Sequence, residues 1–241
     1  MTPSDLSPHP SLTLSTHLYD LASALPVHIL PGPDDPSGAI LPQQPFPRAM
    51  FSGAISFETF HRDTNPVWLR LQCGTDPEQP SSQGSSSPTV GRPPVTRSVL
   101  VTSGQPVIDM FKYLPTPPFT PLSIAELTLQ WRHIAPTAPD TLWCHPYSDR
   151  DPFILYETPD IYIIGGMSEF ATTLAGPEQD RKGKKSRQCR IVLLPSFAET
   201  GMLALVNMRT LDVRCVNFGV KGMSAGGGQA RLPEEDAMQE G

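Results

Sequence analysis

Apolar residues along this chain fall into short runs that proline and glycine turns separate. Leu14, Leu18, Leu21 and Leu25 recur at the spacing of one helix face, which predicts a helix over residues 14–25. The apolar run at residues 27–30 then predicts a short buried strand, which the Pro-Gly-Pro-Asp-Asp-Pro turn at residues 31–36 ends.

Strands and helices continue to alternate further along the chain. A strand is predicted over residues 99–103, followed by a turn at Gly104, a helix that begins near residue 107, and a second helix over 122–133. Continuous apolar runs predict a buried central strand over 159–168, a strand over 190–195, and an antiparallel hairpin over 201–207 and 211–216. This order of elements is typical of an α/β fold.

Polar and small residues stand where three of these strands end. They are Pro33, Asp34 and Asp35 after the first strand, Ser103 after the second, and Gly166 and Ser168 in the glycine turn after the third. Because α/β folds place their binding sites at the carboxyl ends of strands, we expect these residues to lie near any functional site.

Composition sets the limits of the folded part. The 29 prolines among 241 residues gather in turns and in one low-complexity segment. We expect a disordered arm over 1–13, one domain over 14–218, and a disordered tail over 219–241. Within the domain we expect a disordered insertion over 73–98 and a basic loop over 178–188.

Charge and cysteine usage exclude several classes of function. The net charge of −6 disfavours a dedicated nucleic-acid binder. The sequence contains no run of eighteen apolar residues, so we expect no membrane partner. The four cysteines form no C-x-x-C pair, so we expect a reduced intracellular protein, and Cys144 beside His145 is a poor zinc site. His133 with Asp140 suggests a hydrolase triad, but no G-x-S-x-G turn presents a nucleophile, so His133 is expected to be structural.

Several motifs resemble a known family. Gly32-Pro33-Asp34-Asp35 occupies the place of Gly-Asn-His-Asp in calcineurin-like metallophosphoesterases, and Leu-Pro-Gln-Gln-Pro at 41–45 is similar to the B-type subunits of replicative DNA polymerases. The run Arg-His-Ile-Ala-Pro-Thr-Ala-Pro-Asp-Thr-Leu at 132–142 most resembles the small subunits of the delta type.

The resemblance implies the carboxyl-terminal part of a phosphoesterase-like domain, a partial two-sheet sandwich flanked by helices, with an uncovered sheet edge. It also implies that this fold has lost its metals, so that no catalytic residue, cofactor site or metal site remains. The degenerate former metal positions would be Pro33, Asp34, Asp35, Ser103, Gly166 and Ser168.

For function, the resemblance implies a non-catalytic accessory subunit of the nuclear DNA polymerase delta complex, acting in DNA replication and repair. Its expected partners are the cysteine-rich carboxyl-terminal domain of the catalytic subunit and the third accessory subunit, with DNA contacted only indirectly or weakly. The rigid loops at 42–45 and 136–139 are candidate binding surfaces, or simply turns. The alternatives are an active metal-dependent phosphoesterase or 3′-exonuclease, and a stand-alone DNA-binding module.

Overall fold

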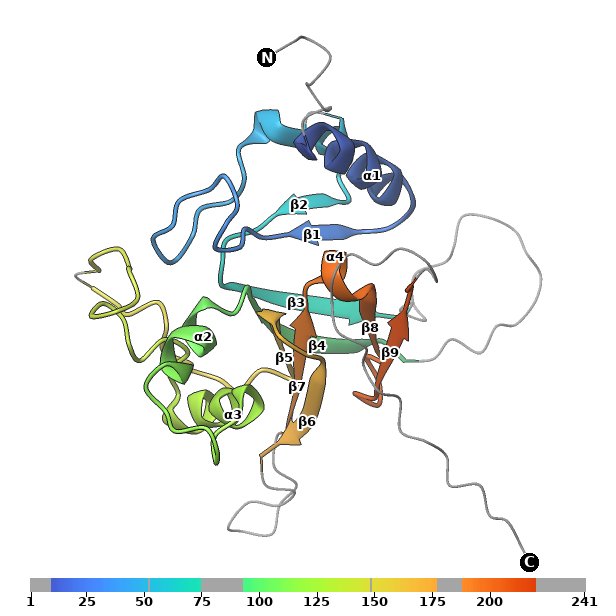
Figure 1. The fold of residues 1–241 in the computed structure, drawn as a ribbon. Coiled ribbons are helices and arrows are strands. Elements are labelled where there is room, and N and C mark those ends of the chain that lie inside the picture. The colour runs from blue at the N-terminus through green and yellow to red at the C-terminus, as the bar shows by residue number, and fades with distance from the viewer. Residues whose placement is uncertain (1–9, 52, 75–92, 148, 177–187, 220–241) are drawn as a thin grey trace, which may run out of the picture.

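The computed structural model describes residues 10–51, 53–74, 93–147, 149–176 and 188–219 (Figure 1). They contain both strands and helices around a mixed sheet, which confirms the predicted α/β class. The elements are α1 (Pro10–Ala24), β1 (Val27–Ile29), η2 (Arg48–Phe51), η3 (Ala54–Ser56), β2 (Phe60–Arg62), β3 (Val67–Cys73), β4 (Val95–Thr102), α2 (Gln105–Phe111), α3 (Pro121–Trp131), β5 (Ile161–Met167), β6 (Ala171–Ala175), β7 (Cys189–Pro195), α4 (Phe197–Thr200), β8 (Met202–Val206) and β9 (Val213–Asn217).

The central element is a five-stranded sheet in the order β3-β4-β5-β7-β6. Its three middle strands are parallel to one another, and the edge strands β3 and β6 run antiparallel to their neighbours. The prediction of a buried central strand is confirmed by β5, in which Ile161, Tyr162 and Ile164 are almost fully buried. Strand β5 carries apolar residues on both faces because both faces of the sheet are covered there.

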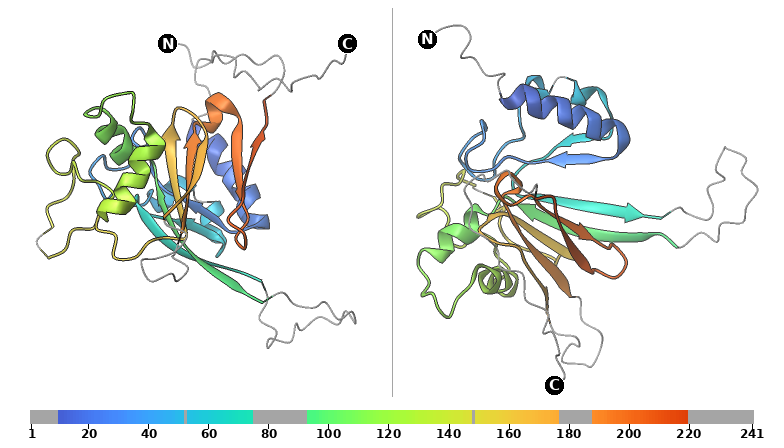
Figure 2. Two further views of the ribbon diagram at one scale, coloured as in Figure 1. Left: turned by 90° about the horizontal axis from the view of Figure 1, so that it is seen from below. Right: turned by 45° about the vertical axis from the view of Figure 1, so that its right-hand side comes forward.

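The two faces of the sheet are covered differently (Figures 1 and 2). Helices α2 and α3 and the loop that follows them cover one face and enclose the main core, which includes Leu100, Ile124, Tyr162 and Ile191. The hairpin of β8 and β9 lies on the other face, where Val99, Ile161 and Leu211 form a smaller core. The predicted antiparallel hairpin is therefore confirmed, with Val206 paired to Val213 beside the turn.

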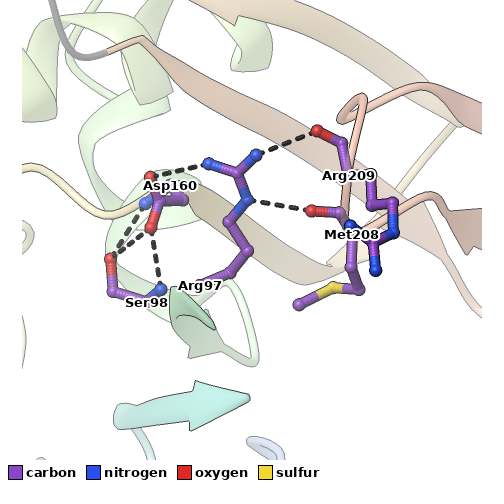
Figure 3. Close-up of polar contacts among 5 residues, drawn as sticks. All are labelled: Arg97, Ser98, Asp160, Met208 and Arg209. Atoms are coloured by element: carbon purple, nitrogen blue, oxygen red, sulfur yellow. Dashed lines mark hydrogen bonds and ion pairs between the residues drawn. The ribbon is translucent and has the colours of Figure 1, made fainter. Parts of the chain in front are cut away.

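A partly buried arginine joins the hairpin to the sheet (Figure 3). Arg97 of β4 donates from Nε to the Met208 carbonyl and from Nη2 to the Arg209 carbonyl, both at 2.9 Å, in the turn between β8 and β9. Its Nη1 lies 3.5 Å from Asp160, whose carboxylate accepts from the Ser98 amide at 2.9 Å. One guanidinium therefore links the hairpin turn to the carboxylate before β5, and Arg190 of β7 adds a second link by donating from Nε to the Leu211 carbonyl at 2.7 Å.

A smaller unit precedes the sheet, with α1 packed over the two parallel strands β1 and β2 (Figure 1). Leu18 and Ala22 face Phe46, Phe51 and Phe60 in its core. The helix predicted over 14–25 is confirmed, although the strand after it is only half-buried because a two-stranded sheet covers few residues.

Two predicted boundaries are wrong. The arm predicted over 1–13 is helical from Pro10 onward, because proline fits the first helical turn. The insertion predicted over 73–98 is shorter, because Cys73 pairs with Val95 and the β3–β4 ladder holds residues 95–98 in a strand despite their polarity. Residues 1–9 and 75–92 lie outside the described part.

Other expectations fall on residues that the structure leaves out. The basic loop at 178–188 and the tail at 219–241 lie outside the described residues except for Gln188 and Gly219. Strands β2 and β6 were not predicted from the sequence. The alanine and threonine residues of β6 form a strand because they pair antiparallel with the buried strand β7.

Candidate functional site

The ends of β1, β4 and β5 meet, as the sequence led us to expect. The Ser103 hydroxyl after β4 donates a hydrogen bond to the Pro31 carbonyl after β1. A Cβ atom on Gly166 of β5 would lie 2.8 Å from the Ser103 carbonyl oxygen, and the φ of Gly166 is +66°. A Cβ atom on Gly104 would lie 2.2 Å from the Gly165 carbonyl oxygen. These strand ends therefore pack backbone against backbone, with no room for a larger side chain at either glycine.

The two aspartates of the first turn do not extend towards the other strand ends. The Asp35 carboxylate accepts a hydrogen bond of 2.7 Å from the Gly32 amide and so closes its own turn. Pro33 and Asp34 are exposed. The carboxylate that the resemblance placed at a former metal position is thus occupied by a local backbone contact.

A cluster of three side-chain amides, Gln43, Asn65 and Gln105, lies among these strand ends. Asn65 Nδ2 donates to Gln43 Oε1 at 2.6 Å and to Gln105 Oε1 at 3.0 Å, and Gln105 Nε2 donates to Gln43 Oε1 at 2.9 Å. Gln43 and Asn65 are fully buried. Each amide has both a donor and an acceptor group, so the three side chains can bond to one another without any net charge.

The amide cluster also holds the surrounding backbone. Gln43 Nε2 donates to the carbonyls of Gly32 and Gly38, both at 2.9 Å, and Asn65 Oδ1 accepts from the Ser103 amide at 3.1 Å. The cluster thereby joins the turn after β1, the segment before β3 and the start of α2. Its position at the strand ends and its neutral donors suit a fixed connection between loops.

The cluster does not have the side chains that a hydrolytic metal pair uses. Such sites hold their ions with carboxylate, imidazole and amide ligands together. Among the residues that the structure describes, no three His, Cys, Asp or Glu side chains come together in an arrangement that could hold a metal ion. The amide oxygens of the cluster already accept hydrogen bonds. Ser168 lies apart from the cluster's hydrogen bonds, on a groove of about 490 Å³ beside Ile108 and Phe111 of α2.

The amide cluster was missed as a unit from the sequence. Gln43 was considered only as part of a rigid loop, and its full burial shows that this part of the loop serves the interior. A signal was present, since Gln43 follows Pro42, Asn65 precedes Pro66 and Gln105 follows Gly104. An amide next to a turn residue is, however, common at surfaces too.

His133 is hydrogen-bonded, and its carboxylate partner is Asp151 rather than Asp140. The Ala135 amide donates to His133 Nδ1 at 3.2 Å, which leaves Nε2 to donate to Asp151 at 2.8 Å. Burial acts to raise the pKa of Asp151, but the hydrogen bonds from His133 and from the Phe153 amide outweigh it and hold that pKa below its usual value. Asp140 is exposed.

Comparison with known sequences places these features in a family. The sequence profile of the B-type subunits of DNA polymerases alpha and epsilon matches residues 3–75 and 95–172, which is more than half of the chain. The chain belongs to this family. The matched ranges contain the whole amide cluster, and the gap between them coincides with the segment that separates β3 from β4.

Individual relatives agree with this result. The chain is 40% identical over 199 residues to "DNA polymerase delta subunit 2" of Drosophila melanogaster, covering 83% of this chain and 39% of the relative. It is 32% identical to "DNA polymerase delta small subunit" of Oryza sativa, covering 87% and 42%. The protein of the same name in Saccharomyces cerevisiae is also 32% identical, covering 87% and 43%. The chain therefore spans about two fifths of the length of these relatives.

Proposed function

We propose that this chain acts as a non-catalytic accessory subunit of DNA polymerase delta, in the nucleus, in DNA replication and repair. The observation that carries the proposal is the family match over more than half of the chain, together with relatives that are named as delta subunits. No helix in the described part of the chain is long and apolar enough to cross a bilayer.

The strand-end site supports a role other than hydrolysis. In this proposal the domain is a calcineurin-like phosphoesterase fold that has lost its metals, and Pro33, Asp34, Asp35, Ser103, Gly166 and Ser168 are the degenerate former metal positions. The closed Asp35 turn, the Ser103 contact with Pro31 and the positive φ of Gly166 fit this history. A site closed in this way keeps its loops in fixed positions, which suits a binding surface.

The proposed partners are the cysteine-rich carboxyl-terminal domain of the catalytic subunit and the third accessory subunit, which this chain would hold together. DNA contact would be indirect or weak, because the chain carries a net charge of −6. Of the two candidate loops, the one at 136–139 is the better surface. Its Pro139 is exposed beside a groove of about 420 Å³ that Tyr147 and Arg150 also line, whereas Gln43 in the other loop is buried.

The decisive experiment is capture of the isolated carboxyl-terminal domain of the delta catalytic subunit. The bait is this chain, and a second bait joins it to the amino-terminal part of the Drosophila relative. Capture by both baits, weakened by Tyr147→Ala but not by Gln72→Ala, supports an interface on the 136–153 segment. Capture by the longer bait alone moves the interface upstream, and failure of both refutes the polymerase assignment.

A second experiment tests the alternative of a working phosphoesterase or exonuclease. Purified chain with Mn²⁺ is expected to leave a phosphodiester substrate and a 3′-ended single strand intact, because the described residues lack a metal-binding set. Hydrolysis that Asp35→Ala abolishes and Asp34→Ala spares would contradict the proposal. Salt-dependent binding of single-stranded DNA by the chain alone would instead favour the DNA-binding alternative.

A further inference from the structure

Threonine–proline pairs occur at three places in the described part of the chain, in very different surroundings. They are Thr116-Pro117, Thr120-Pro121 and Thr158-Pro159. A threonine hydroxyl followed by proline is the acceptor that proline-directed protein kinases recognise. A folded protein offers such a pair only where both residues can be reached from solvent, so the structure decides between the three.

Thr158 is held by the sheet. Arg132 Nη1 donates to its hydroxyl at 3.0 Å, and the following residue, Pro159, is buried. Directly after this pair, the Asp160 amide donates to the Ser98 carbonyl at 2.9 Å. A kinase cannot draw this segment into its active site unless the start of β5 unfolds locally. Thr158 is therefore an internal control for a threonine–proline pair that the fold protects.

Thr120 is in the opposite situation. It is exposed, and it ends the connection between α2 and α3, in which residues 112–120 form turns but no helix or strand. Its backbone is extended, with φ of −124° and ψ of 159°, and kinases bind their substrates in extended conformations. Pro121 is only half-buried and lines the groove of about 490 Å³ beside α2. Both residues of the pair therefore reach solvent.

Only local contacts hold the Thr120 side chain. Thr120 Oγ1 accepts a hydrogen bond of 3.2 Å from the Ser123 amide. The Ser123 hydroxyl in turn bonds to the Thr120 amide at 2.9 Å and to the Thr120 carbonyl at 2.8 Å. All of these contacts are exposed and lie within four residues, so opening them leaves the core intact.

A phosphate on Thr120 is compatible with the fold. Residues 113–125 carry no charged side chain, and the first turn of α3 contains no acidic residue, so no carboxylate there repels the new charge. Phosphothreonine carries nearly two negative charges at neutral pH, and negative charge before the first turn of a helix is favourable. The choice of Thr120 rests on its exposure, its backbone and its proline, and the helix only tolerates the product.

We propose that Thr120 is a phosphorylation site for a proline-directed protein kinase. Thr120 Oγ1 forms a bond to the γ-phosphorus of ATP, and the bond from that phosphorus to the oxygen bridging to the β-phosphate breaks. ADP leaves, and a base of the kinase takes the hydroxyl proton. The modification places a dianion in an otherwise uncharged stretch of the chain. The proposal goes beyond the accessory-subunit function and does not depend on it.

The test is phosphorylation of the full chain by a purified cyclin-dependent kinase with ATP, followed at each site by peptide mass spectrometry. Synthetic peptides covering residues 115–125 and 153–163 give the rate at each threonine without the fold. The rate in the chain divided by the rate in the peptide should be near one for Thr120. It should be below about one tenth for Thr158, because Thr158 reacts only after local unfolding.

Several results would overturn the proposal. They are a ratio at Thr120 as low as that expected for Thr158, failure of the kinase to modify Thr120 in its peptide, and phosphate on Thr116 in place of Thr120. Two variants separate the hydroxyl from the helix cap, because serine and aspartate both cap helices but only serine accepts phosphate. Thr120→Ser should keep the modification at residue 120 and Thr120→Asp should lose it, with unchanged circular dichroism in both. Loss of the modification in both variants would also count against the site.

Discussion

Replacing Asn65 by alanine is expected to lower the free energy of unfolding by about 2–4 kcal/mol. The Ser103 amide and Gln105 Oε1 lose the hydrogen bonds of 3.1 and 3.0 Å that Asn65 makes with them, whereas Gln43 Oε1 keeps its bond from Gln105. A buried polar group without a partner costs about 1–3 kcal/mol. Ser103 and Gln105 are only half-buried, so each contributes towards the lower end of that range.

Urea unfolding at low micromolar protein, followed by circular dichroism, measures this loss. With a denaturant slope of about 2 kcal/mol per molar, the midpoint should fall by about 1–2 M. Asn65→Asp keeps the shape but turns the amide donor into an acceptor that faces two acceptor oxygens, so it should cost at least as much. Gln44→Ala, at the exposed amide next to the cluster, is the matched control and should stay within about 0.5 kcal/mol. If Asn65→Asp is as mild as Gln44→Ala, the amide cluster does not hold these loops together.

Three further substitutions test other parts of the fold. Tyr162→Phe should raise the melting temperature slightly, because the Tyr162 hydroxyl is fully buried and no well-formed hydrogen bond satisfies it among the described residues. Burial raises its pKa, and the neighbouring Thr128, whose hydroxyl donates to the Ala125 carbonyl, opposes this only in part. A loss above about 1 kcal/mol would show that Thr128 is a true partner. Burial acts to raise the pKa of Asp109, but Thr141, at 2.6 Å, and the other polar neighbours of the carboxylate lower it below 3.8. The stabilisation that the Asp109 carboxylate provides is therefore complete above about pH 4 and lost as pH falls through the lowered pKa. Asp109→Asn should flatten the acid limb of a curve of unfolding free energy against pH. An unchanged acid limb would show that Asp109 does not cause it. Arg97→Met should speed hydrogen exchange in β8 and β9 while β5 stays protected, because the Arg97 bonds to the hairpin turn are lost. Equal exchange in both proteins would show that the apolar contacts and the bond from Arg190 Nε to the Leu211 carbonyl hold the hairpin without Arg97.

Local patterns were sufficient for the elements whose burial is periodic or continuous. The apolar run of β5 and the paired runs of the β8–β9 hairpin each reflect contacts made by several residues in a row. In α1, by contrast, only Leu18 of the four regularly spaced leucines is buried. A pattern of that length remains recognisable when a few residues depart from it, so it was sufficient to predict the α/β class. The strand ends could be expected to meet for the same reason, because parallel strands share one carboxyl edge.

Tertiary structure decided what depends on single distant contacts. Asn65 meets Gln43 across 22 residues and Gln105 across 40, and nothing local marks an amide as buried. The strand β6 and the polar end of β4 exist because a neighbouring strand satisfies their backbone, not because of their own side chains. The groove between β3 and the segment at 154–157 likewise depends on a contact between distant parts of the chain, which sequence periodicity does not contain.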